Sequence, residues 1–384
     1  MRHSGCFLAL TLLLFSCLLF FFNVSPTFAA DDAPQQNIIL ISVDGLNYEG
    51  YSSYEKNNLK YLALDGSSTD KCLAVRADTI EAGEASLLTG CLPEEHLYYS
   101  RNDKVETESL LDVICKSGRS VLVVDGSGGK LQGFARGLEE YVQIDSKEPD
   151  SKVMEKAIGL FLEKKPFFTY IYLDDCKTSA VRVNSPEHFR NLRNMDMEIG
   201  KLIGVLKDWK IYGETCLIIT ASRSSSASSM VPLIVKSSGI KVNSRLQGVS
   251  VIDVAPTICA LAGLERPHNC SGVVIWDAFA PGERYGAETL IKRQMEELQQ
   301  ERVRVWNRLY QTMKEKDSLS HRIEEIKEEQ ESIFDYAGQN EQTIAQLRKR
   351  LDQTKGLIAG IIVLFLAGYL VEYRWLKRRF MLFK

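Results

Sequence analysis

Apolar runs separated by amphipathic stretches dominate the first 280 residues. The first run, residues 37–43, is almost uniformly apolar and ends at Asp44-Gly45. Further runs of this kind span residues 120–124, 167–173, 215–220 and 231–236. Uninterrupted apolar runs are typical of strands buried on both faces, and the intervening segments are long enough for crossover helices. The pattern therefore predicts an α/β domain, residues 36–280, with a central mostly parallel sheet covered by helices on both faces.

Polar residues follow four of these runs directly. They are Asp44-Gly45, Asp125-Gly126, Asp174-Asp175 and the serine-rich segment 222–229. Ligands of open α/β sheets bind beyond the carboxyl ends of the strands, so a carboxylate there suits a metal or phosphate site. An aspartate before glycine can also simply cap a turn, and the strand alone leaves both roles open for Asp44.

After Pro281-Gly282 the pattern changes to a heptad seam. Thirteen of the eighteen seam positions are apolar, and the residues between them are mostly charged or amide. The seam positions are Ile291, Met295, Leu298, Arg302, Val305, Leu309, Thr312, Lys316, Leu319, Ile323, Ile326, Gln330, Ile333, Ala337, Asn340, Ile344, Leu347 and Leu351. We expect a coiled-coil stalk over residues 285–352, about 90 Å long, because a lone helix would leave the stripe in water.

The stalk predicts a partner helix. A parallel homo-oligomer is favoured over an antiparallel hairpin, because no good turn interrupts the middle of the seam. Polar seam residues such as Arg302, Lys316, Gln330 and Asn340 would fix the register at some cost in stability. Gly338 is a possible kink.

Both ends of the chain suggest a membrane protein. Residues 1–30 have the basic start, apolar run and small residues of a signal peptide, with an uncleaved anchor as the alternative. Residues 356–375 are apolar enough for a membrane helix, and the basic tail 376–384 favours a cytoplasmic C-terminus. Together these features predict a single-pass protein whose globular domain faces outside the cytoplasm.

Composition limits the remaining options. With 384 residues and a formal net charge of −3, the chain has no basic excess that would indicate nucleic-acid binding. Seven cysteines follow the signal segment, and none has the spacing of a zinc or redox motif. At least one thiol must stay unpaired, and Cys72 with Cys91 is a candidate disulfide.

Several blocks in order resemble a known superfamily. They are the Val43-Asp44-Gly45 strand end, "EASLLTGCLPEEH" from Glu84, "VPLIV" from Val231 and "VIDVAPTICALAGLERP" from Val251. Their order over residues 37–276 is similar to that of the alkaline phosphatase superfamily, in its sulfatase and type I phosphodiesterase/nucleotide pyrophosphatase branch. The resemblance implies an alkaline-phosphatase-like fold with two divalent cations, and a Thr, Ser or modified Cys nucleophile at a helix N-terminus.

The resemblance assigns two positions near the first strand. Asp44 matches the family's first-strand metal ligand. Thr79 is the candidate nucleophile, but the spacing to Leu87-Leu88-Thr89-Gly90 places the nucleophile position on Ile80. Thr79 can equally be a helix N-cap.

The family's other metal ligands are poorly matched. Asp174 and Asp175 are the remaining carboxylate candidates, but no histidine follows them in the family's pattern. Thr220-Ala221-Ser222-Arg223 stands where the family has an aspartate and a histidine. A guanidinium at Arg223 would repel a dication but could hold a phosphate or sulfate, so Arg223 is a candidate anion-binding residue.

Three functions remain open from the sequence. The preferred one is a catalytically impaired relative of the phosphodiesterases and sulfatases that acts by binding or assembly. The second is an active phosphoester or sulfate-ester hydrolase with a reduced site for Zn, Mn or Mg. The third is a structural stalk protein whose globular part acts only as a spacer or cap.

Overall fold

The computed structural model describes residues 37–54, 57–176, 185–223, 229–282 and 285–380. The predicted signal peptide lies outside these residues. The chain divides into two compact units between Glu301 and Arg302. We call the described part of the first unit, from Asn37 to Glu301, the head.

The head is built on one eight-stranded sheet with the order β4-β3-β5-β1-β6-β7-β2-β8. Its strands are β1 (Asn37–Val43), β2 (Ser67–Leu73), β3 (Val121–Asp125), β4 (Glu140–Gln143), β5 (Phe168–Leu173), β6 (Thr215–Thr220), β7 (Met230–Lys236) and β8 (Ser244–Arg245). Strands β4, β3, β5, β1 and β6 are parallel to one another, whereas β7 is antiparallel to both β6 and β2. The predicted α/β class with a mostly parallel sheet is confirmed.

The five predicted strands are all present, within a few residues of their expected bounds. One expectation was wrong: β6 and β7 are not parallel strands joined by a crossover. These strands pair in antiparallel fashion across the short segment 221–229, which is too short for the return path that parallel strands need. Strands β2, β4 and β8 were missed because they are short or polar and carry no apolar run.

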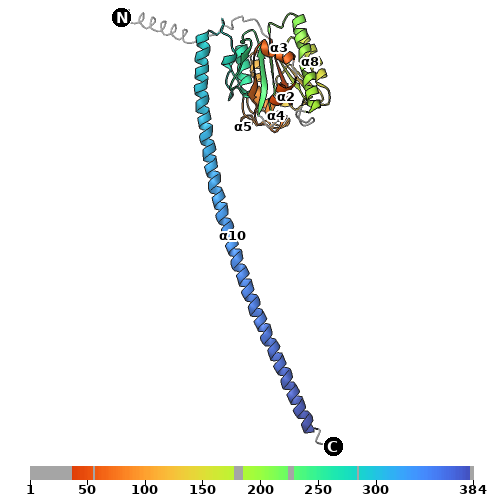
Figure 1. Cartoon of the computed structure of the whole chain (residues 1–384), viewed down its shortest axis with the longest axis vertical. Helices are drawn as coiled ribbons and strands as arrows, with labels where there is room; N and C mark the ends of the chain where they lie inside the picture. Colours follow the sequence, from red (N-terminus) through yellow and green to blue (C-terminus); the bar gives the residue numbers. More distant parts are fainter. Residues whose placement is uncertain (1–36, 55–56, 177–184, 224–228, 283–284, 381–384) are drawn as a thin grey trace, which may run out of the picture. The chain divides into compact units, whose positions relative to one another are not determined.

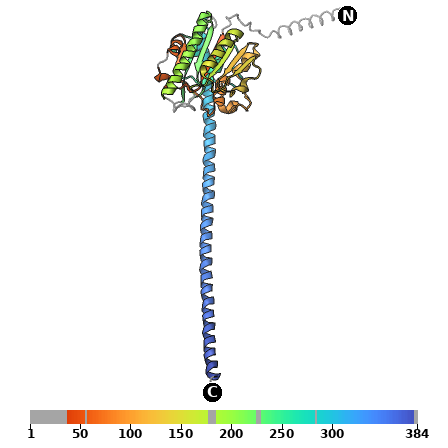
Figure 2. The same ribbon diagram turned by 90° about the vertical axis from the view of Figure 1, so that its right-hand side faces the viewer.

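Helices form layers on the two faces of the sheet (Figures 1 and 2). Among the described residues, the helices before the long C-terminal one are α2 (Tyr48–Ser53), α3 (Asn58–Leu64), α4 (Ile80–Thr89), α5 (Pro93–His96), α6 (Leu110–Lys116), α7 (Asp150–Lys164), α8 (Pro186–Asp208) and α9 (Val254–Ala262). Helix α8 packs against α2, α3 and α7, whereas α4 packs against α5, α6 and α9. Single 3₁₀ turns lie at Gln132–Phe134, Val251–Asp253 and Trp276–Ala278. The helix α4 thus lies over the sheet beside the end of β1.

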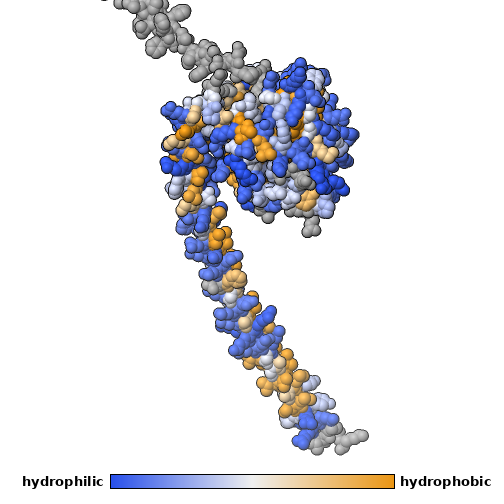
Figure 3. All heavy atoms as spheres, turned by 45° about the horizontal axis from the view of Figure 1, so that its top comes forward, coloured by the Kyte–Doolittle hydropathy of each residue, from blue (hydrophilic) through white to orange (hydrophobic). Residues whose placement is uncertain are grey.

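The long helix α10 (Ala287–Phe380) has 94 residues and continues through Gly338 without a break. Its first turns belong to the head: Leu290 is buried, and the Glu297 carboxylate accepts a hydrogen bond from the backbone N–H of Val274. Beyond the head, its apolar stretch is long enough to cross a membrane by length and composition. Figure 3 shows apolar residues gathered along this part of α10.

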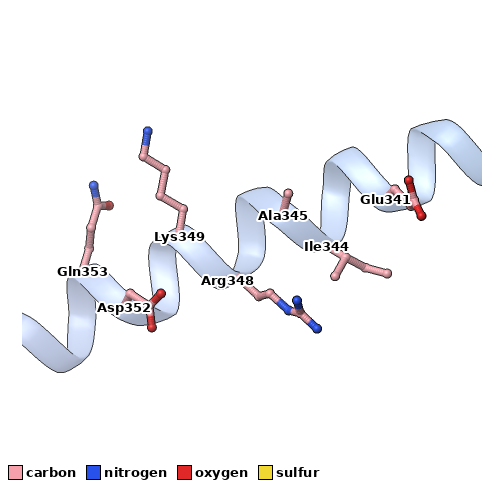
Figure 4. A pocket seen from close by; sticks show the side chains of 7 residues that line it. All are labelled: Glu341, Ile344, Ala345, Arg348, Lys349, Asp352 and Gln353. Atoms are coloured by element: carbon pink, nitrogen blue, oxygen red, sulfur yellow. The ribbon is translucent and has the colours of Figure 1, made fainter.

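The heptad seam of α10 is exposed over its whole length. Its large apolar side chains range from 48% exposed at Leu309 to 66% at Ile333. Figure 4 shows Ile344 on the same side of the helix as Arg348 and Asp352, while Lys349 extends from the other side. Charged residues thus flank the seam, and the described residues of this chain do not cover it.

All seven cysteines after the signal segment are free thiols. The Cys72–Cys91 disulfide that the sequence suggested is therefore not formed in this structure. Cys72 is buried within β2, whereas the Cys91 thiol lies 3.2 Å from the carbonyl oxygen of Asn269. The two side chains occupy different surroundings, which their separation along the sequence did not reveal.

Candidate functional site

The sheet brings the predicted strand ends to one edge. Strands β3, β5, β1 and β6 are neighbours and parallel, so their carboxyl ends meet there. Asp44 follows β1 and is 4% exposed, and its backbone N–H donates to the Leu173 carbonyl at 2.9 Å. Gly45 has φ 86°, which a residue with a side chain rarely adopts. The backbone thus fixes Asp44 at the edge as the sequence predicted.

A histidine supports this turn. The His188 ring lies in α8, is fully buried, and donates from Nε2 to the Gly45 carbonyl oxygen at 3.2 Å. Because a carbonyl only accepts hydrogen bonds, Nε2 must carry the hydrogen. His188 therefore positions the turn after β1, and this nitrogen is not available as a metal ligand.

The partner of Asp44 is Arg223. The Arg223 guanidinium lies 2.8 Å from Asp44 Oδ2, and both side chains are largely buried. Burial opposes the charge on Arg223, but the Asp44 carboxylate outweighs it and raises the pKa of Arg223. Arg223 Nε is buried and has no hydrogen-bond partner among the described residues. The two candidate residues thus converge, and they neutralise each other.

Helix α4 leaves space for this arginine at Gly83. A Cβ added there would lie 3.3 Å from Arg223 Cβ and 2.9 Å from Ser222 Oγ. Both contacts are tighter than ordinary packing, so a side chain at position 83 would push the segment after β6 away from α4. The glycine is part of the geometry that holds Arg223 against Asp44.

A second buried carboxylate lies beside the ion pair and was missed from the sequence. Glu84 in α4 is 1% exposed and accepts hydrogen bonds from Ser42 Oγ at 2.7 Å, Ser222 Oγ at 2.6 Å and the Tyr170 hydroxyl. Burial raises the pKa of Glu84 to about 7, against the opposing effect of these hydroxyl donors. A lone glutamate among apolar and small residues of an inward-facing helix was the available signal.

Thr79 is the N-cap of α4. Its hydroxyl oxygen accepts a hydrogen bond from the Ala82 backbone N–H at 3.2 Å, and the helix begins at Ile80. Ile80, which takes the family's nucleophile position by spacing, is a buried apolar residue. The observed hydrogen bond is the one that a capping threonine makes.

Asp174 and Asp175 are tied to the start of α7. Asp150 Oδ1 accepts from the backbone N–H groups of Asp174 at 2.8 Å and Asp175 at 3.2 Å. In return Asp175 Oδ2 accepts from the Asp150 backbone N–H at 2.9 Å. Asp150 is itself buried, and burial together with Asp175 raises its pKa to about 7. These reciprocal bonds join the end of β5 to α7.

A polar cavity of about 560 Å³ opens at the same edge, after β3 and β4. Its charged lining residues are Glu81, Arg101, Lys130 and Asp145. The mixture of two acids and two bases favours a polar ligand that carries both donors and acceptors.

Solved structures of several hydrolases match the head. Murine ectonucleotide pyrophosphatase/phosphodiesterase 5, as an inactive variant in complex with AMP, aligns with a TM-score of 0.55 and 13% identity, over 64% of this chain and 100% of that chain. The phosphonate monoester hydrolase of Agrobacterium radiobacter aligns with a TM-score of 0.52 and 12% identity, over 65% and 78% of the two chains. A 2-O GAG sulfatase aligns with a TM-score of 0.50 and 16% identity, over 62% and 73%.

The head has the alkaline phosphatase superfamily fold. Protein-family models and the sequences of characterised proteins give no significant match. The expected fold is therefore seen in three dimensions although sequence identity is low.

The alkaline-phosphatase-like head does not provide the ligands of a two-metal centre within the described residues. No group of three or more His, Cys, Asp or Glu side chains in that part of the chain could hold a metal ion. Asp44 Oδ2 binds Arg223 instead, and Asp175 Oδ2 binds the α7 backbone. The donor set that is present therefore does not fit two cations.

Proposed function

We propose that the protein is a membrane-anchored, externally facing alkaline-phosphatase-like domain that is catalytically impaired and acts by binding or assembly through its coiled coil. The observation that carries this proposal is the 2.8 Å ion pair between Asp44 and Arg223. Asp44 is the best match to a family metal ligand, and a guanidinium occupies the place beside it.

The charge of Arg223 supports an impaired site. An arginine stays protonated at any physiological pH, and Asp44 stabilises the charged form further. A divalent cation at Asp44 would have to displace this guanidinium and would then face an unpaired buried positive charge. Ser222, at the position of the family's aspartate, donates its hydroxyl to Glu84 and offers no carboxylate.

The long helix supports the assembly part of the proposal. Its apolar stretch near the C-terminus suits a single membrane span, and the basic residues Lys377, Arg378 and Arg379 favour a cytoplasmic end. The exposed seam needs a partner helix, for which a second copy of this chain in parallel orientation is the simplest choice. Membrane anchoring and oligomerisation would then present several heads at one surface.

Metal content and turnover test the proposal. We expect the full chain, purified in detergent, to hold no stoichiometric zinc or manganese and to show no turnover of p-nitrophenyl phosphate or bis-p-nitrophenyl phosphate. Two metal equivalents together with turnover that is lost in Thr79→Ala would instead establish an active hydrolase. Thr79→Ser is the matched control, because it keeps a hydroxyl at the same position.

Deleting residues 291–351 tests the role of the stalk. We expect the oligomer seen by analytical ultracentrifugation to dissociate into single chains. An unchanged oligomer would show that the helix is not the assembly element.

A further inference from the structure

Two loops of the head cross at the end of α4. Gly90 ends the helix in a left-handed conformation with φ 70°, and its carbonyl oxygen accepts hydrogen bonds from the backbone N–H groups of Ser271 and Gly272, both at 2.9 Å. The segment after α9 is thus held directly against the segment after α4. Cys91 follows Gly90, and Cys270 precedes Ser271, so the crossing brings two cysteines to one place.

The two thiols point at each other's backbone. Cys91 Sγ lies 3.2 Å from the carbonyl oxygen of Asn269, the residue before Cys270. Cys270 Sγ lies 3.5 Å from the carbonyl oxygen of Gly90, the residue before Cys91. A Cβ added at Gly90 would lie only 2.4 Å from Cys270 Sγ, so the glycine permits this approach. Each sulfur is therefore positioned beside the residue that leads into the other cysteine.

Burial makes it unfavourable for either thiol to act alone as a nucleophile toward a substrate or oxidant in solution. Cys91 and Cys270 are 0% and 6% exposed. Burial first, and then the neighbouring Cys91, raises the pKa of the Cys270 thiol to about 12. A reactive cysteine needs an accessible thiolate, which this site does not provide in the folded head.

We propose that Cys91 and Cys270 form a disulfide when the head folds in an oxidising compartment. This inference rests on the export in the proposed function, because disulfides persist outside the reducing cytosol. The reaction takes two thiols and one small-molecule or protein disulfide as oxidant. The new S–S bond forms as the two cysteines lose two protons and two electrons, which convert the oxidant to two thiols.

Cys259 is the nearest competitor. It lies close enough to feel the second thiol, since the pKa of Cys259 is raised by burial and then by Cys270. Cys259 is buried within α9, however, whereas the Cys91 thiol contacts the backbone of Asn269, directly before Cys270. Cys91 is therefore the better placed partner.

The disulfide would brace the site edge. It would close a loop from residue 91 to residue 270 and tie the C-terminal end of α4 to the segment after α9. The same junction already holds a side-chain link from Ser271 Oγ to Glu95 Oε1 at 2.7 Å. Because α4 carries Thr79 at its start and Glu84 in its middle, the bond would fix the helix that packs against Arg223.

Peptide mapping of the purified full chain tests the pairing. The full chain is refolded in detergent in the presence of glutathione disulfide, remaining free thiols are alkylated under denaturing conditions, and the digest is analysed by mass spectrometry without reduction. We expect a linked peptide pair containing Cys91 and Cys270, which reduction separates. Alkylated Cys91 and Cys270, or a link from either one to Cys259 or Cys72, would overturn the proposal.

Variants supply an independent readout. We expect reduction to lower the thermal midpoint of the oxidised wild type by several degrees, because the cross-link constrains the unfolded chain. Cys270→Ser should abolish this difference between oxidised and reduced samples, whereas Cys115→Ser, in α6, should keep it. An equal redox response in Cys270→Ser would contradict the assignment. Since oxidation is carried out on purified protein, the result is independent of where the head lies in the cell.

Discussion

The head buries its apolar residues, whereas the long helix α10 exposes the apolar residues of its seam. In the head, strands such as β1 and β5 are buried on both faces, and the core is completed by helices of the same unit. In α10, the seam residues from Ile291 to Leu351 are exposed although their periodicity is as regular as that of any buried face. A stripe of this kind is stable only against another helix. The head thus covers its own apolar residues, whereas the seam would be covered by the partner helix of the proposed coiled coil.

Charged residues also differ between the two regions in their burial. The head buries carboxylates and an arginine where each has partners, as Asp44 with Arg223 and Glu84 with three hydroxyls. The charges of α10 lie at its surface, where ion pairs contribute little. We therefore expect substitutions in the head to change its own stability, and substitutions in the seam to change assembly.

The largest effect is expected from the seam. Replacing Ile326 and Ile333 by aspartate would put two carboxylates into the interface of a coiled coil. Each change removes apolar burial and adds a charge, at a cost of roughly 3 kcal/mol or more. The association constant should fall at least a hundredfold, seen as dissociation in analytical ultracentrifugation in detergent.

Ser332→Asp is the control for this prediction. It introduces the same charge on the outer side of the helix, next to Ile333, and should leave the oligomer intact. The thermal midpoint of the head should stay unchanged in both proteins. Dissociation by the control variant as well would show that charge alone, and not the seam, governs assembly.

The buried ion pair should give the next largest effect. Arg223→Met leaves the Asp44 carboxylate buried without its cation, which costs about 3 kcal/mol or more. Combining it with Asp44→Asn should cost less than the sum of the two single changes, because the double variant buries no unpaired charge. Urea unfolding of the head, followed by tryptophan fluorescence, measures these differences.

An exposed pair provides the comparison. Arg245 lies 3.6 Å from Asp70 and its side chain is 78% exposed, so Arg245→Met should cost less than about 1 kcal/mol. If Arg223→Met cost no more than this, the pair with Asp44 would not be a buried structural element. Displacement of Arg223 by a metal at Asp44 would then cost little energy.

The sequence predicted the fold well because its main strands are long and apolar. The parallel strands that meet at Asp44 could be identified from their runs alone, and the resemblance then located Thr79 and Arg223. The ion pair could not be foreseen in detail, because it joins residues far apart in the chain across a helix packed at Gly83. The Glu84 cluster was missed for the same reason: its donors Ser42, Tyr170 and Ser222 come from three separate strand regions.

Glu84 should make the stability of the head depend on pH. Its pKa is raised to about 7 in the folded head from an ordinary 4.5, so folding favours the protonated acid. Its contribution is complete below about pH 4.5, falls as pH rises toward 7, and is lost above it. The shift corresponds to about 3 kcal/mol, and Glu84→Gln should remove this share of the pH dependence.

The Glu84→Gln variant should keep part of the pH dependence of stability seen in the wild type. Asp150 and Asp253 are also buried with pKa values raised to about 7, and they act in the same direction. Glu81→Gln, in the first turn of the same helix, is the matched control and should leave the profile of urea midpoint against pH unchanged. An identical profile in wild type and Glu84→Gln would show that Glu84 stays ionised in the folded head.

The smallest effect on stability is expected at Thr79, where the N-cap role and the nucleophile role predict different results. If Thr79 acts as an N-cap, Thr79→Ala removes the capping hydroxyl and should lower the free energy of unfolding by about 1 kcal/mol. Thr79→Ser should retain most of this stability because serine caps equally well. Urea unfolding measures both variants. A nucleophile would instead leave stability nearly untouched while removing turnover. The cap hydrogen bond to Ala82, with buried Ile80 at the spacing of the nucleophile, favours the stability effect.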